Sequence, residues 1–150
     1  MDLAEIIETR FERLRINDII LYLCKRINET RKTMIFIQYP ACGTCQKAKK
    51  WLVEQGISAN TRHIVDEAPT ESELTEWIAR SGLPVKKFFN TSGVLYKELA
   101  LKDKLPTMTE AEQIALLATN GKLVKRPLLV DADFVLVGFK PEDWAKTLKR

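Results

Sequence analysis

Apolar and polar positions follow two different periods on either side of Pro40, and this change organises the chain. Residues 34–39 form a short apolar run rich in strand-favouring side chains, and Pro40 cannot continue a central strand. From Cys45 to Leu52, small and apolar side chains recur at helical spacing, with lysines on the opposite side. The pattern therefore predicts a strand, a turn and a helix that begins at or just after Cys42.

The rest of the pattern predicts an α/β domain whose sheet is interrupted by a helical block. Alternating residues predict a second strand at 58–65, and apolar runs near the C-terminus predict a hairpin. Between the second strand and the hairpin, two Thr-x-x-Glu capping boxes, at 70–73 and 109–112, predict helix starts. The hairpin strands are predicted at 128–130 and 134–139, and the helical segments at 71–80, 83–89, 96–101, 109–120 and from Pro141 onward. A βαβ unit that opens with two cysteines is typical of a thioredoxin-like fold.

Residues 1–33 lie outside this domain, so the predicted organisation is 1–33 and 34–150. An approximate apolar stripe among charged residues predicts a helical extension, interrupted near Asn17-Asp18, where a second helix would be capped. Three roles stay open for it: a packing appendage, a dimerisation helix, or translated sequence upstream of a start at Met34. Cys24 in this extension fits a small packing residue better than a redox partner.

Composition narrows the class of protein without identifying it. At 150 residues the chain can bury one real core, and its net charge of +4 is too small and too scattered to indicate direct nucleic-acid binding. Three cysteines are too few for a disulfide framework, which favours a reducing compartment. Because no apolar run has the length of a membrane span and the N-terminal region lacks a signal-peptide pattern, we expect a cytoplasmic protein with no membrane partner.

The Cys-x-x-Cys pair is the strongest chemical signal. Cys42 falls at a predicted helix start, where the free amides of Gly43, Thr44 and Cys45 and the positive end of the helix dipole favour a thiolate. Cysteines in such motifs have pKa values of about 3.5 to 7.5, against about 8.5 for a free thiol. Cys42 is therefore the predicted nucleophile. Cys45, one turn later on the same face, can form a disulfide with it.

Two other interpretations of the pair are weaker. A zinc site would need more ligands, and only His63 and Cys24 remain, with no second paired motif at metal-ligand spacing. We therefore expect no metal. Two buried, inert cysteines are the other alternative. His63 belongs to no recognisable catalytic motif, so it is predicted to be a structural strand residue and not a catalytic base.

Pro127 precedes a predicted strand and follows Arg126. In a thioredoxin-like arrangement, the loop at this point faces the cysteine pair. A cis proline there would hold the backbone beside the thiols.

Four segments together carry a family resemblance. They are Tyr-Pro-Ala-Cys-Gly-Thr-Cys-Gln-Lys-Ala-Lys-Lys-Trp-Leu, Phe-Phe-Asn-Thr-Ser-Gly, Lys-Arg-Pro-Leu-Leu-Val and Val-Gly-Phe-Lys. Over residues 34 to about 150 the chain resembles the ArsC/Spx family of arsenate-reductase-related proteins, and its middle block is more similar to the reductase-like branch than to the regulators. The resemblance implies a thioredoxin-like core with a helical insertion, Cys42 as the catalytic cysteine, and Arg126 as the arginine that precedes a cis proline and faces the thiolate.

The chain departs from the arsenate reductases that it resembles. Those enzymes hold the oxyanion with three arginines, and only Arg126 matches; the other two positions fall near Asn90-Thr91-Ser92 and Phe139-Lys140. Lysine does not replace the bidentate geometry of a guanidinium. The reductases also carry histidine near the position of Tyr39 and serine near that of Cys45, where a second thiol makes an internal disulfide possible, as in the Spx branch.

Two functional hypotheses follow. In the first, the protein is a thiol-dependent reductase: Cys42 attacks an oxyanion or disulfide, Cys45 resolves the adduct, and Gly43, Thr44, Arg126 and Pro127 bind the anionic substrate. It would need no tightly bound cofactor, and glutathione, thioredoxin or glutaredoxin would return it to the reduced state. In the second, it is an Spx-like transcription regulator whose cysteine pair controls binding to the C-terminal domain of the RNA polymerase α subunit.

Overall fold

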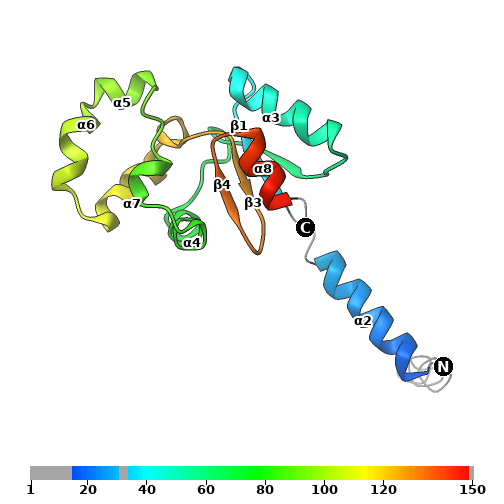
Figure 1. Cartoon of the computed structure of the whole chain (residues 1–150). Helices are drawn as coiled ribbons and strands as arrows, with labels where there is room; N and C mark the ends of the chain where they lie inside the picture. Colours follow the sequence, from blue (N-terminus) through cyan, green and yellow to red (C-terminus); the bar gives the residue numbers. More distant parts are fainter. Residues whose placement is uncertain (1–14, 31–33, 149–150) are drawn as a thin grey trace. The chain divides into compact units, whose positions relative to one another are not determined.

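The computed structural model describes residues 15–30 and 34–148. The chain divides into two compact units, Met1–Lys32 and Thr33–Arg150. The second unit is built on a four-stranded sheet of β1 (Ile35–Gln38), β2 (Asn60–His63), β3 (Leu128–Val130) and β4 (Val135–Val137), in the order β2-β1-β3-β4. β1 and β2 are parallel, while β3 is antiparallel to both β1 and β4. The predicted α/β architecture is confirmed, and Figure 1 shows the sheet between its helices.

One face of the sheet is covered by α3 (Gly43–Glu54) and α8 (Pro141–Leu148). A parallel β1–β2 pair needs a crossover, and α3 supplies it. The helix turns its small and apolar side chains inward, against Phe36 of β1 and Leu129 of β3. Trp144 of α8 closes this layer: its ring packs edge-on against Phe36, and its Nε1 donates a hydrogen bond to the Gly138 carbonyl at 3.1 Å.

The opposite face is covered by α4 (Glu71–Ser81) and α7 (Glu110–Thr119). Side chains alternate along a strand, so Ile37 enters this second core while its neighbour Phe36 enters the first. Both helices begin with the capping boxes that the sequence predicts. Thr70 with Glu73 opens α4, and Thr109 with Glu112 opens α7, each pair making reciprocal side-chain and backbone hydrogen bonds.

The predicted helical insertion lies between β2 and β3 and is made of short pieces. After α4 come η1 (Val85–Phe88), α5 (Val94–Glu98), α6 (Leu101–Lys104), η2 (Leu105–Thr107), α7 and η3 (Gly121–Leu123). At Gly121 the backbone of the insertion lies very close to the backbone at the end of β2, since a Cβ on Gly121 would lie 1.8 Å from the Ile64 carbonyl oxygen. The predicted helix at 83–89 is instead a single 3₁₀ turn, in which Pro84 is the extended residue before the first helical position.

The two strands predicted at 58–65 and 134–139 are shorter than expected. β2 is an edge strand and pairs only with the four residues of β1. β4 stops at Gly138, which has a positive φ of 73° that ends an extended strand.

The first unit contributes one helix to the described residues, α2 (Ile16–Thr30). Its start lies within two residues of the predicted interruption, and Asp18 falls in its first turn. Cys24 is exposed on α2, so the described residues do not bury it. The remainder of the predicted extension lies outside the described residues. In the part of the chain that the structure describes, no helix combines the length and apolar character needed to cross a membrane.

Candidate functional site

Cys42 is held at the start of α3 by a tight turn that follows β1. Its backbone amide donates to the Tyr39 carbonyl at 2.9 Å, and its own carbonyl accepts from the Gln46 amide at 3.1 Å. The Gln46 side chain donates to the Pro40 carbonyl at 2.8 Å and so braces the turn. Cys42 is the N-cap residue, with extended backbone angles, as the sequence predicts. The sulfur therefore lies where helix amides and the helix dipole act on it.

The surroundings of Cys42 favour its thiolate. Partial burial raises its pKa, but several groups that stabilise the anion outweigh this effect, so its pKa lies below the ordinary thiol value. These groups are the backbone amide and thiol of Cys45, the guanidinium of Arg126 and the amide of Thr44. Hydrogen bonding from these donors stabilises the anion, and this lowers the pKa of Cys42.

Cys45 has the opposite character. It is fully buried in α3, and desolvation is the main cause that raises its pKa to about 12. The neighbouring Cys42 raises it further, through its hydrogen bond and its charge. Both cysteines are free thiols. At neutral pH the pair therefore consists of one ionisable thiol open to the cleft and one protonated thiol behind it.

Arg126 reaches this site from the segment that leads into β3. The Arg126–Pro127 peptide bond is cis, as predicted. The guanidinium carbon lies 4.7 Å from the ring centroid of Tyr39, and the guanidinium interacts with the Cys42 sulfur. Pro127 is buried, and its carbonyl accepts a hydrogen bond from the Gly138 amide at 2.8 Å. Arg126 is thus brought together with Cys42, whereas Pro127 is a buried residue that links the backbones of β3 and Gly138.

A cleft with a volume of about 830 Å³ opens beside Cys42. Of the predicted anion-binding residues, Thr44 and Arg126 line it, whereas Gly43 and Pro127 do not. The two regions that stand where the arsenate reductases have arginines also line the cleft, through Asn90 and Ser92 and through Phe139 and Lys140. Its polar and charged lining includes Lys87, Asn90, Ser92, Lys125, Lys140 and Asp143. The cleft is thus predominantly cationic.

Sequence reasoning missed Tyr39, Lys87 and Lys125 as parts of this site. Lys87 and Lys125 are two of 24 lysines and arginines, so their charge alone could not have selected them. Tyr39 offered a signal, because it is an aromatic residue in the turn before the nucleophile. His63 lies behind Tyr39, with ring centroids 5.6 Å apart, and does not line the cleft.

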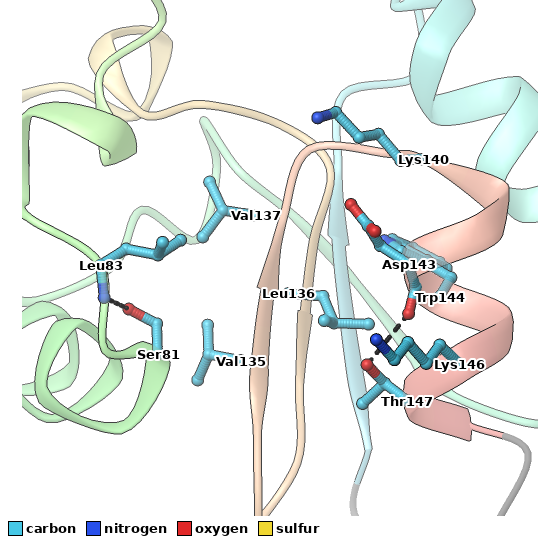
Figure 2. A pocket seen from close by; sticks show the side chains of 10 residues that line it. All are labelled: Ser81, Leu83, Val135, Leu136, Val137, Lys140, Asp143, Trp144, Lys146 and Thr147. Atoms are coloured by element: carbon cyan, nitrogen blue, oxygen red, sulfur yellow. Dashed lines mark hydrogen bonds between the residues drawn. The ribbon is translucent and has the colours of Figure 1, made fainter.

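A second hollow of about 320 Å³ lies along β4, between the end of α4 and α8 (Figure 2). It is lined by Val135 and Val137, which point toward Leu83, and by Leu136, which points toward α8. Leu83, Val137, Lys140 and Asp143 are shared with the Cys42 cleft. It contains neither a cysteine nor a histidine. Among the described residues, no group of three His, Cys, Asp or Glu side chains is placed to hold a metal ion. The Cys42 cleft is therefore the candidate site.

Comparison with known proteins gives consistent matches over this unit. The model of the ArsC family matches residues 37–147. YusI of Bacillus subtilis is 52% identical and the alignment covers 75% of this chain and 99% of YusI. The regulatory protein MgsR of the same organism is 32% identical, and the alignment covers 78% of this chain and 91% of MgsR. The global transcriptional regulator Spx of Staphylococcus haemolyticus is 28% identical, and the alignment covers 74% of this chain and 83% of that Spx.

Solved structures agree with these matches. A structure of an ArsC family related protein from Bacteroides fragilis is 71% identical, with a TM-score of 0.76, and the match covers 77% of this chain and 98% of that one. An arsenate reductase from Vibrio cholerae is 25% identical, with a TM-score of 0.66 and coverages of 77% and 98%. The thioredoxin-like fold with a helical insertion is thereby confirmed.

Proposed function

Because the chain belongs to the ArsC family, we propose that it is a thiol-dependent reductase in which Cys42 is the nucleophile and Cys45 the resolving thiol. The observation that carries this proposal is the contrast within the pair. Cys42 lines the cleft and has a lowered pKa, while the buried Cys45 keeps its proton up to about pH 12. The thiolate is the reactive form of cysteine, so the attacking and resolving roles are assigned by ionisation.

The reaction proceeds in two displacements. The Cys42 thiolate attacks one sulfur of a disulfide, forms a mixed disulfide and expels the other sulfur as a thiolate. Cys45 then attacks the Cys42 sulfur, which closes the internal disulfide and releases the second thiolate. The first step removes the Cys42 charge, which is one of the causes that raise the pKa of Cys45. Cys45 therefore loses its proton more easily once the adduct has formed, and this proton passes to a departing thiolate.

External thiols, either one dithiol or two monothiol molecules, supply the two electrons that reopen the internal disulfide. Thioredoxin, or glutathione with glutaredoxin, is the proposed reductant, and no tightly bound cofactor is needed. A cytoplasmic location is part of this proposal, because free thiols persist in that reducing compartment.

The cleft favours a disulfide that bears anionic groups over a simple oxyanion. Tight oxyanion binding relies on bidentate guanidinium contacts, and in the described part of the cleft Arg126 is the one arginine. Lys87, Lys125 and Lys140 add positive charge without that geometry. A volume of about 830 Å³ falls in the range of sites for drug-sized ligands, far larger than an inorganic oxyanion requires. A glutathione mixed disulfide fits this chemistry.

The test is an NADPH-coupled assay with thioredoxin or glutaredoxin, in which arsenate, a glutathione mixed disulfide and a model disulfide are offered separately. We expect turnover of the mixed disulfide, loss of turnover in Cys42→Ser, and accumulation of an unresolved Cys42 adduct in Cys45→Ser. Cys24→Ala is the matched control, because it removes the exposed thiol outside the cleft. Turnover that survives Cys42→Ser would refute the proposal.

A second candidate function is supported by the matches to MgsR and Spx, which are named as regulators. In it, oxidation of the Cys42–Cys45 pair would switch binding to the C-terminal domain of the RNA polymerase α subunit. A pull-down of that purified domain with oxidised and with reduced protein separates the two. Capture by one redox form alone supports the regulator, and no capture together with reductant-coupled turnover supports the reductase.

A further inference from the structure

The ring of Tyr39 lies between the Arg126 guanidinium and His63. Its centroid is 4.7 Å from the guanidinium carbon of Arg126 and 5.6 Å from the centroid of His63, with the latter two rings inclined at 67°. The sheet brings these residues together. β1 and β3 are antiparallel with Ile37 opposite Leu128, and continuing this register two positions past that pair sets Tyr39 opposite Arg126.

Two arginines of this unit show different ways of holding a guanidinium. Arg62 donates to both carboxylate oxygens of Glu73, at 2.7 and 3.0 Å, so its charge is balanced by an anion. Arg126 makes no ion pair with any carboxylate in the described residues. The face of an aromatic ring attracts a cation without neutralising it. Arg126 therefore keeps its full positive charge for the sulfur of Cys42.

The ring is itself supported from behind. His63 ends β2, next to the last residue of β1 in the parallel pair. Its Nδ1 accepts hydrogen bonds from the backbone amides of Val65 and Asp66, at 3.3 and 3.1 Å, which fixes the imidazole plane. The edge contact between His63 and Tyr39 then limits how the phenol ring can turn.

We propose that Tyr39 is a positioning residue of the candidate site: its ring holds the Arg126 guanidinium against the Cys42 sulfur, with His63 as the support of the ring. The inference rests on the proposed role of Cys42 as the attacking thiolate. Without the ring, the long Arg126 side chain has many rotamers and spends less time at the sulfur.

Other charged groups face the same space and must stay constant in the test. Cys45 and Arg126 flank the Cys42 sulfur, and the cleft walls add Lys87, Lys125, Lys140 and Asp143. On the other side of Tyr39 lies His63, whose Nδ1 is 3.3 Å from a carboxylate oxygen of Asp66. None of these residues is substituted in a Tyr39 variant, and Arg126 is the one whose position we expect to change. The readout is therefore the pH profile of Cys42 alkylation, measured by peptide mass mapping in the full-length Cys24→Ala chain.

We expect Tyr39→Leu to reduce alkylation at about pH 6 by about threefold or more and to move the profile to higher pH. Tyr39→Phe keeps the aromatic face and should restore the parent profile. Tyr96→Leu is the matched control, because it also removes a partly buried tyrosine with one ring contact, to Phe89, and it does not line the cleft. Should Tyr39→Leu fail to fold by circular dichroism, Tyr39→Met takes its place.

A double-mutant cycle decides whether the effect passes through Arg126. In an Arg126→Gln background, Tyr39→Leu should cause no further loss. A parent-like profile for Tyr39→Leu, or an equal loss in both backgrounds, would overturn the inference while leaving the proposed function standing. A parent protein whose Cys42 reacts no faster at about pH 6 than a free thiol would overturn both.

Discussion

The two thiols of the candidate site, three residues apart, are expected to differ greatly in reactivity. At pH 7 a thiol with a pKa of about 12 is ionised in roughly one molecule in 10⁵. A thiol with the ordinary value of about 8.5 is ionised in a few molecules in a hundred, and the pKa of Cys42 lies below its ordinary value. Ionisation alone therefore favours Cys42 by on the order of a thousandfold, and the complete burial of Cys45 adds to this.

The assay uses three chains that share Cys24→Ala, so that the exposed thiol of α2 does not contribute. The first keeps both site cysteines, the second carries Cys42→Ser and the third Cys45→Ser. Each is exposed to iodoacetamide at about pH 7, where an ordinary thiol is only slightly ionised, with and without urea. We expect one labelled cysteine in the first and third native chains, none in the second, and labelling of every remaining cysteine after unfolding.

The Cys42→Ser chain is the critical case. Removing Cys42 removes two of the causes that raise the pKa of Cys45, but desolvation, the largest cause, remains. Cys45 should therefore stay unlabelled until the protein unfolds. Fast labelling of Cys45 in the native Cys42→Ser chain would refute the assignment of attacking and resolving roles.

Three further predictions concern single residues. Arg126→Gln should lower Cys42 alkylation at about pH 6 by about tenfold, because a charge-assisted hydrogen bond to the thiolate is lost. Glu73→Gln should cost about 1 kcal/mol of unfolding free energy at about pH 7 in urea titrations. The hydrogen bonds from Arg62 lower the pKa of Glu73 in the folded protein. The ion pair therefore stabilises the fold fully above the unfolded-state pKa of about 4.3, and this stabilisation is lost as the pH falls through the lower folded-state pKa. Gly121→Ala should cost about 2 kcal/mol or more, because its Cβ would overlap the Ile64 carbonyl.

Each of these has a control and a contradicting result. Arg126→Lys keeps a positive charge and should lose less reactivity than Arg126→Gln; equal losses would mean that charge is not the cause. A Glu73→Gln deficit that persists unchanged in strongly acidic solution would exclude the ion pair as its source. Lys122→Ala, at an exposed neighbour of Gly121, should leave stability nearly unchanged, and a wild-type-like Gly121→Ala would contradict the close approach.

Some features of the fold could be predicted because they depend on neighbours in sequence. Helix capping joins residues three apart, so the boxes at Thr70 and Thr109 were readable from the sequence and are present. The strand, turn and helix around Cys42 follow from the same short range. Strand lengths were less predictable, because β2 extends only where β1 offers a partner and β4 stops at a left-handed glycine.

By itself, the sequence determined the α/β class, the helical insertion, Cys42 at a helix start and the order of the family motifs, since each follows from local periodicity or spacing. Only the tertiary structure decided which distant residues meet Cys42. The antiparallel pairing of β1 with β3 brings Arg126 to the turn after β1 and sets it over Tyr39. Helical spacing places Cys45 on the apolar side of α3, but its complete burial, which raises its pKa and so distinguishes it from Cys42, arises only in the folded protein.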